Sequence, residues 1–174
     1  VAREIEQVKR FDFCELKEGA HIHFIGIGGI SMSGLAQIAI KNGYKVTGSD
    51  RQKSNITDKL EDLGAVVYEG HNAANVEGAD LCVNTAAVKM DNPEMAACVE
   101  KNIRLIDRAE FLGAVMKKYT HSVGVSGTHG KTTTTSMLAY ALINAQKDPT
   151  ISLGGELDIL DGNIRTGESG YFVT

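Results

Sequence analysis

Several features that would identify a protein class at once are scarce or missing from these 174 residues. Lysine and arginine total 18 against 22 acidic residues, so the basic surface of a dedicated nucleic-acid-binding protein is not indicated. No apolar run approaches the roughly 20 residues of a membrane-spanning helix. The chain has two prolines, no internal repeat and no block of like charges. With 43% hydrophobic and 23% charged residues, its composition is typical of globular proteins.

Cysteine is also scarce. Cys14, Cys82 and Cys98 are odd in number and far apart in sequence, which favours reduced thiols over a disulfide or zinc framework. The first ten residues are polar and charged, so we expect no secretory signal. Together these features predict a soluble, cytosolic globular protein. His21 and His23 are expected to be strand residues because no second pair of metal ligands has suitable spacing.

Short β-branched segments alternate with segments of helical periodicity along the chain. This alternation predicts an α/β fold with a Rossmann-like, doubly wound, mostly parallel sheet. Residues 1–118 hold enough strand–helix units for one domain, and 119–174 begin a second domain with a phosphate-binding (P-loop) α/β pattern. Strands are predicted at 21–25, 45–50, 65–68, 81–84, 103–106, 122–126, 150–153 and 171–174, and helices at 30–42, 55–63, 93–101, 108–116 and 131–146.

Two helices carry more detailed predictions. Asp107 and Glu110 form an Asp-x-x-Glu variant of the capping box at the start of one helix. The last helix is expected to place Met137, Leu138, Ala141 and Leu142 on one buried face.

A first glycine-rich loop, residues 26–34, follows a strand and opens a helix. Glycine lets backbone amides approach a diphosphate closely, and a helix N-terminus favours negative charge. Ser31 replaces the third glycine of the dinucleotide fingerprint, so a ligand-free strand–helix turn stays open as an alternative. Asp50 ends the second predicted strand, where a carboxylate hydrogen-bonds a ribose hydroxyl.

A second glycine-rich loop also lies between a strand and a helix. Its successive amides are expected to form an anion nest, Lys131 to reach the outer phosphates and Thr132 to ligate Mg²⁺. Val125 occupies the place of the usual first glycine, so the loop is a shorter version of the general motif. The predicted ATP-binding residues are Gly127, Thr128, His129, Gly130, Lys131, Thr132 and Thr133, of which Lys131, Thr132 and His129 are the catalytic candidates.

The amino-acid sequences of these two loops resemble those of the Mur ligases, the ATP-dependent amide-forming ligases of peptidoglycan precursor synthesis. The matching stretches are 23–29, 32–36, 48–50, 70–71, 92–94, 108–110 and 127–135, and together they span nearly the whole chain. Thr85 and Ala86 stand where the family commonly has two serines.

The resemblance implies UDP-N-acetylmuramate, L-alanine and ATP as substrates, with Mg²⁺ as cofactor. It places the UDP part of the substrate on Gly28, Gly29, Ile30, Ser31, Met32, Ser33, Asp50, His71 and Arg108. It further implies an acidic metal ligand beyond Thr174 and a third domain, so we expect this chain to be inactive alone.

Four alternatives stay open at this stage. They are a dehydrogenase-type dinucleotide domain, a P-loop switch protein, a UDP-sugar-binding module without catalysis, and the murein tripeptide ligase of the same family. The dinucleotide domain gives the second loop no role, and the chain lacks the Asn-Lys-x-Asp segment with which a regulatory GTPase recognises guanine.

Overall fold

A computed structural model describes residues 10–89, 91–160 and 162–174. The prediction that no signal precedes the fold concerns residues 1–10, of which 1–9 lie outside the described residues. Across the described residues, no helix is both long and apolar enough to cross a bilayer.

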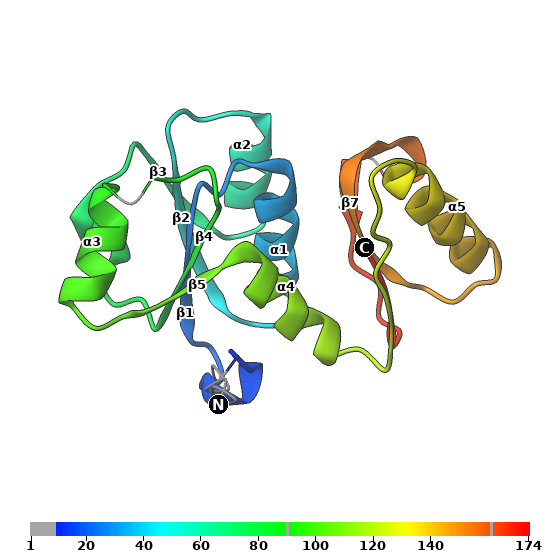
Figure 1. Cartoon of the computed structure of the whole chain (residues 1–174), viewed down its shortest axis with the longest axis horizontal. Coiled ribbons are helices and arrows are strands. Elements are labelled where there is room, and N and C mark those ends of the chain that lie inside the picture. Colours follow the sequence, from blue (N-terminus) through cyan, green and yellow to red (C-terminus); the bar gives the residue numbers. More distant parts are fainter. Residues whose placement is uncertain (1–9, 90, 161) are drawn as a thin grey trace, which may run out of the picture.

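The first sheet has five strands, all parallel, in the order β3-β2-β1-β4-β5. Its strands are β1 (His21–Ile25), β2 (Lys45–Asp50), β3 (Val66–Glu69), β4 (Leu81–Asn84) and β5 (Arg104–Asp107). The connecting helices are α1 (Ile30–Lys41), α2 (Asn55–Asp62), α3 (Pro93–Glu100) and α4 (Arg108–Lys117), with short 3₁₀ turns at Phe13–Glu15 and Ala73–Val76. Helices α1 and α3 lie on opposite faces of the sheet (Figure 1), which confirms the doubly wound Rossmann-like prediction.

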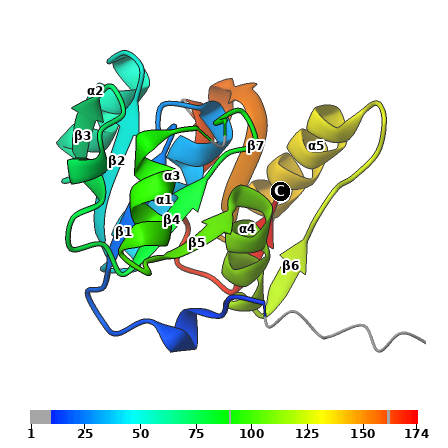
Figure 2. The ribbon, with the colours of Figure 1, turned by 60° about the vertical axis from the view of Figure 1, so that its left-hand side comes forward.

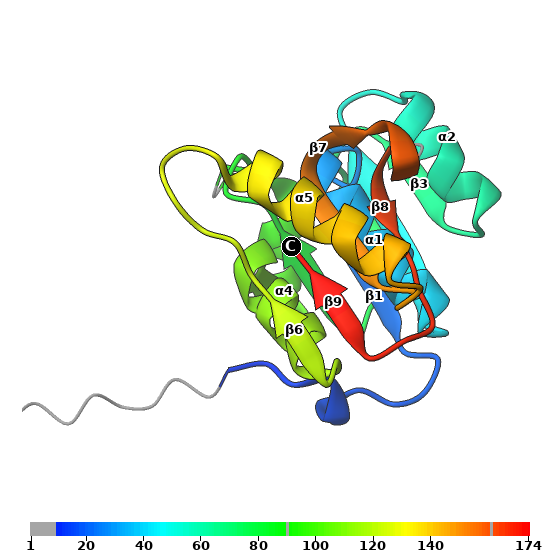
Figure 3. The ribbon, with the colours of Figure 1, turned by 90° about the vertical axis from the view of Figure 1, so that its right-hand side faces the viewer.

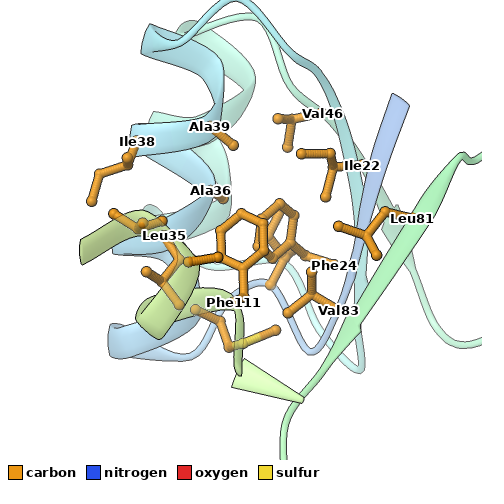
Figure 4. Close-up of a cluster of buried hydrophobic side chains, with 14 of the residues drawn as sticks. Ile22, Phe24, Leu35, Ala36, Ile38, Ala39, Val46, Leu81, Val83 and Phe111 are labelled. Atoms are coloured by element: carbon orange, nitrogen blue, oxygen red, sulfur yellow. The ribbon is translucent and has the colours of Figure 1, made fainter. Parts of the chain in front are cut away.

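The sheet has one apolar face, which α1 and α4 cover. Side chains alternate between the two faces along a strand, so Ile22 and Phe24 of β1 point to this side. Phe111 of α4 packs edge-on against Phe24 with ring centroids 5.3 Å apart, and both are fully buried. Figure 4 shows these rings between α1 and the strands. This cluster fixes α1, and with it the first glycine loop, against the sheet.

The opposite face, toward α3, carries polar groups as well as apolar ones. Val76, Cys82, Ala97 and Cys98 form a small buried cluster, and the three cysteines are free thiols, as expected. His21 and His23 lie on β1 as predicted and are buried. No group of three or more potential metal ligands occurs in the described part of the chain.

The start of α4 differs from the predicted capping box. Asp107 accepts a hydrogen bond from the Glu110 N–H (2.8 Å), which is the expected half of the motif. The Glu110 carboxylate instead accepts from the backbone N–H of Phe11 (2.6 Å). The reciprocal half is absent because the segment before β1 brings a competing donor to this carboxylate.

A second sheet of four strands follows, in the order β6-β9-β7-β8. It contains β6 (His121–Val123), β7 (Thr150–Leu157), β8 (Gly162–Arg165) and β9 (Tyr171–Val173), with α5 (Lys131–Asn144) and a 3₁₀ turn at Asp158–Leu160. Strand β8, which the sequence analysis did not predict, pairs antiparallel to β7. Helix α4 leads from the first sheet to β6 (Figure 2). Each sheet is built from one of the two segments predicted as domains, and we keep that division as a proposal.

The predicted buried face of α5 is wrong in part. Thr135 and Ala139 are buried, whereas Met137 is 69% exposed and Ala141 is exposed. The helix lies across β7 and β9 (Figure 3), and residues four apart share the face that meets these strands. Leu138 and Leu142, which flank that face, are half-buried.

The second sheet also packs against α1, so that it lies between α1 and α5 (Figure 3). Asn163 of β8 donates to the Ile30 carbonyl at the start of α1 (2.7 Å). At the other end of α1, Lys41 donates to the Thr166 carbonyl (3.0 Å) and pairs with Glu168 (2.6 Å). These contacts bring the two glycine-rich loops to neighbouring positions.

Candidate functional site

A cavity of about 550 Å³ lies beside the first glycine loop, at the carboxyl ends of the parallel strands. Strand order reverses between β1 and β4, and ligands of open α/β sheets bind at such a point. Seven of the nine residues predicted to bind the UDP part line this cavity. They are Gly29, Ile30, Ser31, Met32, Asp50, His71 and Arg108, and they are joined by residues of the 85–93 segment that include Thr85 and Asn92.

The first turn of α1 provides the amide donors of this cavity. The helix begins after Gly29 and has no acidic side chain in its first turn. Among the described residues, the N–H groups of Ile30, Ser31 and Met32 have no hydrogen-bond acceptor. Free amides at a helix N-terminus attract a phosphate.

The two remaining residues of the prediction have other partners. The Gly28 N–H donates to Asp50 Oδ2 (2.8 Å), so this amide holds the carboxylate that ends β2. Ser33 is fully buried within α1, where its hydroxyl donates to the Ile30 carbonyl (2.9 Å). Neither residue lines the cavity, because the loop has already turned into helix at Ser33.

Close backbone packing beneath the loop depends on Gly48. A Cβ atom there would lie 2.5 Å from Ile27 Cδ1 and 2.7 Å from the Phe24 carbonyl oxygen. Both distances are too short for any side chain. Gly48 therefore allows the first loop to lie directly on β2.

A buried carboxylate stands behind His71. Glu94, at the start of α3, is fully buried, and its Oε2 accepts from Ser49 Oγ (2.6 Å) and from His71 Nδ1 (2.8 Å). Its Oε1 accepts from Asn75 Nδ2 (2.7 Å) and lies 3.5 Å from His23 Nε2.

These neighbours decide the charge of Glu94. Burial by itself raises the pKa of the carboxyl, but the nearby His23 ring and the hydrogen bonds from Ser49, Asn75 and His71 outweigh it and hold the pKa at about 2. Its place in the first turn of α3 also favours the anion. Glu94 is therefore a buried carboxylate at neutral pH.

Sequence reasoning included Glu94 only as part of a matching stretch and gave it no role. Its one sequence signal is the Asn-Pro-Glu start of a helix, in which Asn92 accepts from the Glu94 N–H (2.8 Å). That signal predicts a helix and not a buried cluster, since the partners come from separate elements.

The same polar face of the sheet holds a chain of hydrogen bonds behind Glu94. His21 Nδ1 contacts the Gly78 carbonyl (2.9 Å), and His21 Nε2 contacts Thr47 Oγ1 (2.8 Å). Thr47 Oγ1 also contacts His23 Nδ1 (2.7 Å). His23 Nε2 is the one buried side-chain nitrogen or oxygen without a hydrogen bond in the described part of the chain. Burial lowers the pKa of His21, whose contact with the Gly78 carbonyl acts in the opposite direction.

The second glycine loop joins β6 to α5, as predicted. Gly130 precedes α5 with φ +77°, a conformation that glycine adopts without strain. The Lys131 ammonium donates to the carbonyls of Gly127 (2.5 Å) and Thr128 (3.3 Å), so it lies over its own loop. The seven predicted residues 127–133 are all exposed.

A cavity of about 430 Å³ lies between this loop and the first one. Lys131 and Thr132 line it, whereas the other five predicted residues do not: Gly127, Thr128, His129, Gly130 and Thr133. The hydroxyl of Thr132 suits Mg²⁺, but none of the described residues that line the cavity supplies a carboxylate. The other residues of the wall are Ser31, Arg108, Val125, Thr135, Ser152, Leu153, Gly154 and Thr174.

Ser31 and Arg108 line both cavities. Arg108 Nη1 donates to Ser31 Oγ (3.1 Å), which ties the start of α4 to the start of α1. The cavity beside the start of α1 and the cavity beside the Gly-Lys-Thr loop therefore meet at one arginine. The model of the Mur ligase family, catalytic domain, matches residues 21–120, which include the first glycine loop and Arg108.

The chain belongs to the Mur ligase family.

Named relatives within the family are close. The chain is 57% identical over 164 residues to a UDP-N-acetylmuramate–L-alanine ligase of Clostridium botulinum, which is 94% of this chain and 36% of that relative. It thus spans about a third of the length of the curated relatives it matches.

Solved structures of Mur ligases have the same fold. The UDP-N-acetylmuramate–alanine ligase of Thermotoga maritima matches with a TM-score of 0.81 and 37% identity, over 88% of this chain and 36% of that one. The UDP-N-acetylmuramate:L-alanyl-γ-D-glutamyl-meso-diaminopimelate ligase of Neisseria meningitides matches with a TM-score of 0.80 and 35% identity, over 88% of this chain and 51% of that one.

Proposed function

We propose that this chain is the UDP-substrate-binding part and the phosphate-binding loop of an ATP-dependent UDP-N-acetylmuramate–L-alanine ligase. The observation that carries the proposal is the meeting of the two cavities at Ser31 and Arg108, because a diphosphate in one cavity and a nucleoside triphosphate in the other would lie side by side. The 57% identity to a named alanine ligase supports the choice of amino acid.

The first cavity would hold the UDP part of the substrate. The free amides of Ile30, Ser31 and Met32 suit the diphosphate. Asp50 and His71, on the β2–β3 side, would meet the uridine. Arg108 would then stand between the diphosphate and the reacting carboxylate, where its positive charge stabilises either group.

The second cavity would hold the ATP phosphates. Lys131 would exchange its contacts with the loop carbonyls for the outer phosphates, and Thr132 would hold Mg²⁺, which neutralises phosphate charge when bound. The reaction implied by the family forms an acyl phosphate on the substrate carboxylate, which the amine of alanine then attacks with loss of phosphate. Positioning and charge neutralisation are what these residues contribute.

The matched segment is 36% of the length of the first named relative, so the complete ligation is proposed for a protein of that greater length. From the 174 residues alone we expect UDP binding without alanine- and ATP-dependent phosphate release. We propose the bacterial cytoplasm as the compartment, in which these substrates are made.

A second candidate is the murein tripeptide ligase of the same family. It is favoured by the Neisseria structure, whose TM-score and identity to this chain are within 0.01 and 2% of those of the Thermotoga ligase. Both candidates use the same UDP-sugar, so the first cavity does not separate them.

Calorimetric titration tests the proposal. The chain is expected to bind UDP-N-acetylmuramate and UDP but not NADH, and Arg108→Ala is expected to weaken both interactions. Lys117→Ala, on the exposed end of the same helix, is the control. Preference for NADH over UDP would refute the proposal and restore the dinucleotide-domain alternative.

A further inference from the structure

Glu94 is the one fully buried acidic side chain among the described residues, yet it does not line the candidate site. It reaches the site through His71, whose ring lines the cavity and is 19% exposed at the side chain. In the proposed function His71 contacts the uridine, whereas Glu94 has no role.

The hydrogen bonds around Glu94 determine which nitrogen of His71 carries the hydrogen. Ser49 Oγ lies 2.6 Å from Glu94 Oε2 and 3.0 Å from His71 Nδ1. A hydroxyl has one hydrogen, and the short contact to the carboxylate uses it. Nδ1 must therefore be the donor, because a bare Nδ1 would face the lone pairs of both Ser49 and Glu94.

The other ring nitrogen is left for a ligand. His71 Nε2 has no hydrogen bond within the described residues, and it is not among their buried unpaired atoms. In a neutral ring with hydrogen on Nδ1, Nε2 is an acceptor. It therefore presents a lone pair where His71 lines the cavity.

The groups that hold the His71 ring come from separate elements of regular structure. Ser49 lies in β2, Glu94 begins α3 and Asn75 lies in the 3₁₀ turn before β4, so three elements hold one carboxylate. A carboxylate that orients a histidine in this way fixes the tautomer as well as the ring angle.

We propose that Glu94 is a positioning residue that holds His71 as the Nδ1–H tautomer, so that Nε2 accepts a hydrogen bond from an N–H or O–H group of the nucleoside part of the ligand. The inference rests on the proposed UDP-binding function and deepens it. A lone pair backed by a buried carboxylate repels phosphate, whereas the free amides of α1 attract it. The ligand is thus oriented with its nucleoside at His71 and its diphosphate at α1.

The tautomer is measured first, in the ligand-free 174-residue chain. Long-range ¹⁵N–¹H correlation spectra of histidine-labelled protein distinguish a ring nitrogen that carries hydrogen from one that does not. The wild type is expected to show hydrogen on Nδ1 of His71 and a bare Nε2. Hydrogen on Nε2 in the wild type overturns the proposal without any variant.

Binding is measured next, with UDP and with inorganic pyrophosphate as probes. Glu94→Gln is expected to weaken UDP binding roughly tenfold, which corresponds to about 1.4 kcal/mol, and to change pyrophosphate binding less than twofold. It is also expected to mix the two tautomers of His71. Glu100→Gln, on the exposed end of the same helix, is the matched control and is expected to change none of these readouts.

The outcomes separate this inference from the function on which it rests. Unchanged UDP affinity and an unchanged tautomer in Glu94→Gln overturn the role of Glu94 and leave the proposed function intact. Equal losses for UDP and pyrophosphate indicate general damage to the site and also overturn it. A wild type that does not bind UDP refutes the proposed function together with the ligand part of this inference, and the tautomer spectrum then decides the positioning role alone.

Discussion

The buried Glu94 carboxylate makes the stability of this protein depend on acid in a calculable way. Its pKa is about 2 in the folded chain, against 4.5 as the ordinary value. A carboxyl with a lowered folded pKa stabilises the fold above its unfolded pKa, and this stabilisation is lost as pH falls toward the folded pKa. The difference corresponds to about 3 kcal/mol at neutral pH, of which about 2 kcal/mol is lost by pH 3.

Urea unfolding at a series of pH values from 7 to 3 measures this loss for the wild type and for Glu94→Gln. The glutamine cannot ionise, so the free energy of unfolding of the variant lacks this contribution to the pH dependence. We expect the difference between the two proteins to shrink by about 2 kcal/mol over this range. Glu100→Gln, with its exposed side chain, should follow the wild type. Parallel curves for the wild type and Glu94→Gln would refute the account of the cluster.

Four further substitutions test the fold. Phe111→Ala removes a fully buried ring and is expected to cost about 3–5 kcal/mol in urea unfolding; a loss below 1 kcal/mol would contradict the packing of α4. Gly48→Ala is expected to destabilise by at least about 1–3 kcal/mol, because its Cβ meets a backbone oxygen. Gly113→Ala in α4, with no atom within 4 Å of its Cβ, should instead raise the free energy of unfolding by about 0.5–1 kcal/mol and so raise the melting temperature. Asp107→Ala, which removes the α4 cap, should cost about 1 kcal/mol, whereas an unchanged melting temperature would contradict that role.

Much of the first sheet could be predicted because its signals are local. A β-branched run closed by Gly26 marks β1, and a helical period closed by Gly43 marks α1. The predicted strand 81–84 has the same bounds in the structure. Strand β8 was missed because Gly-Asn-Ile-Arg has neither alternation nor length, and it exists through its pairing with β7.

The two glycine-rich loops of the candidate site could be predicted because each has a distinctive local sequence motif. Both glycine loops lie between a strand and a helix, as their sequences indicate. The Glu94 cluster was not predictable, since Ser49, His71 and Glu94 are ordinary residues of three separate segments. Only the strand order brings them together, and no local pattern records it.

The hydrogens available to the chain of contacts from Gly78 through His21, Thr47 and His23 to Glu94 can be counted. It contains four links, at 2.9, 2.8, 2.7 and 3.5 Å, and a complete hydrogen bond in each link needs one hydrogen. Two neutral imidazoles and one hydroxyl supply one hydrogen each, and both ends of the chain are acceptors.

The chain is therefore one hydrogen short while both histidines are neutral, and the shortage falls at His23 Nε2, the buried atom without a partner among the described residues. A complete chain would need one more hydrogen, between His23 Nε2 and the Glu94 carboxylate. The same ¹⁵N spectra show which ring nitrogens of His23 carry hydrogen. Beneath the candidate site, the polar face of the first sheet thus contains one hydrogen-bond position that its own groups leave unfilled.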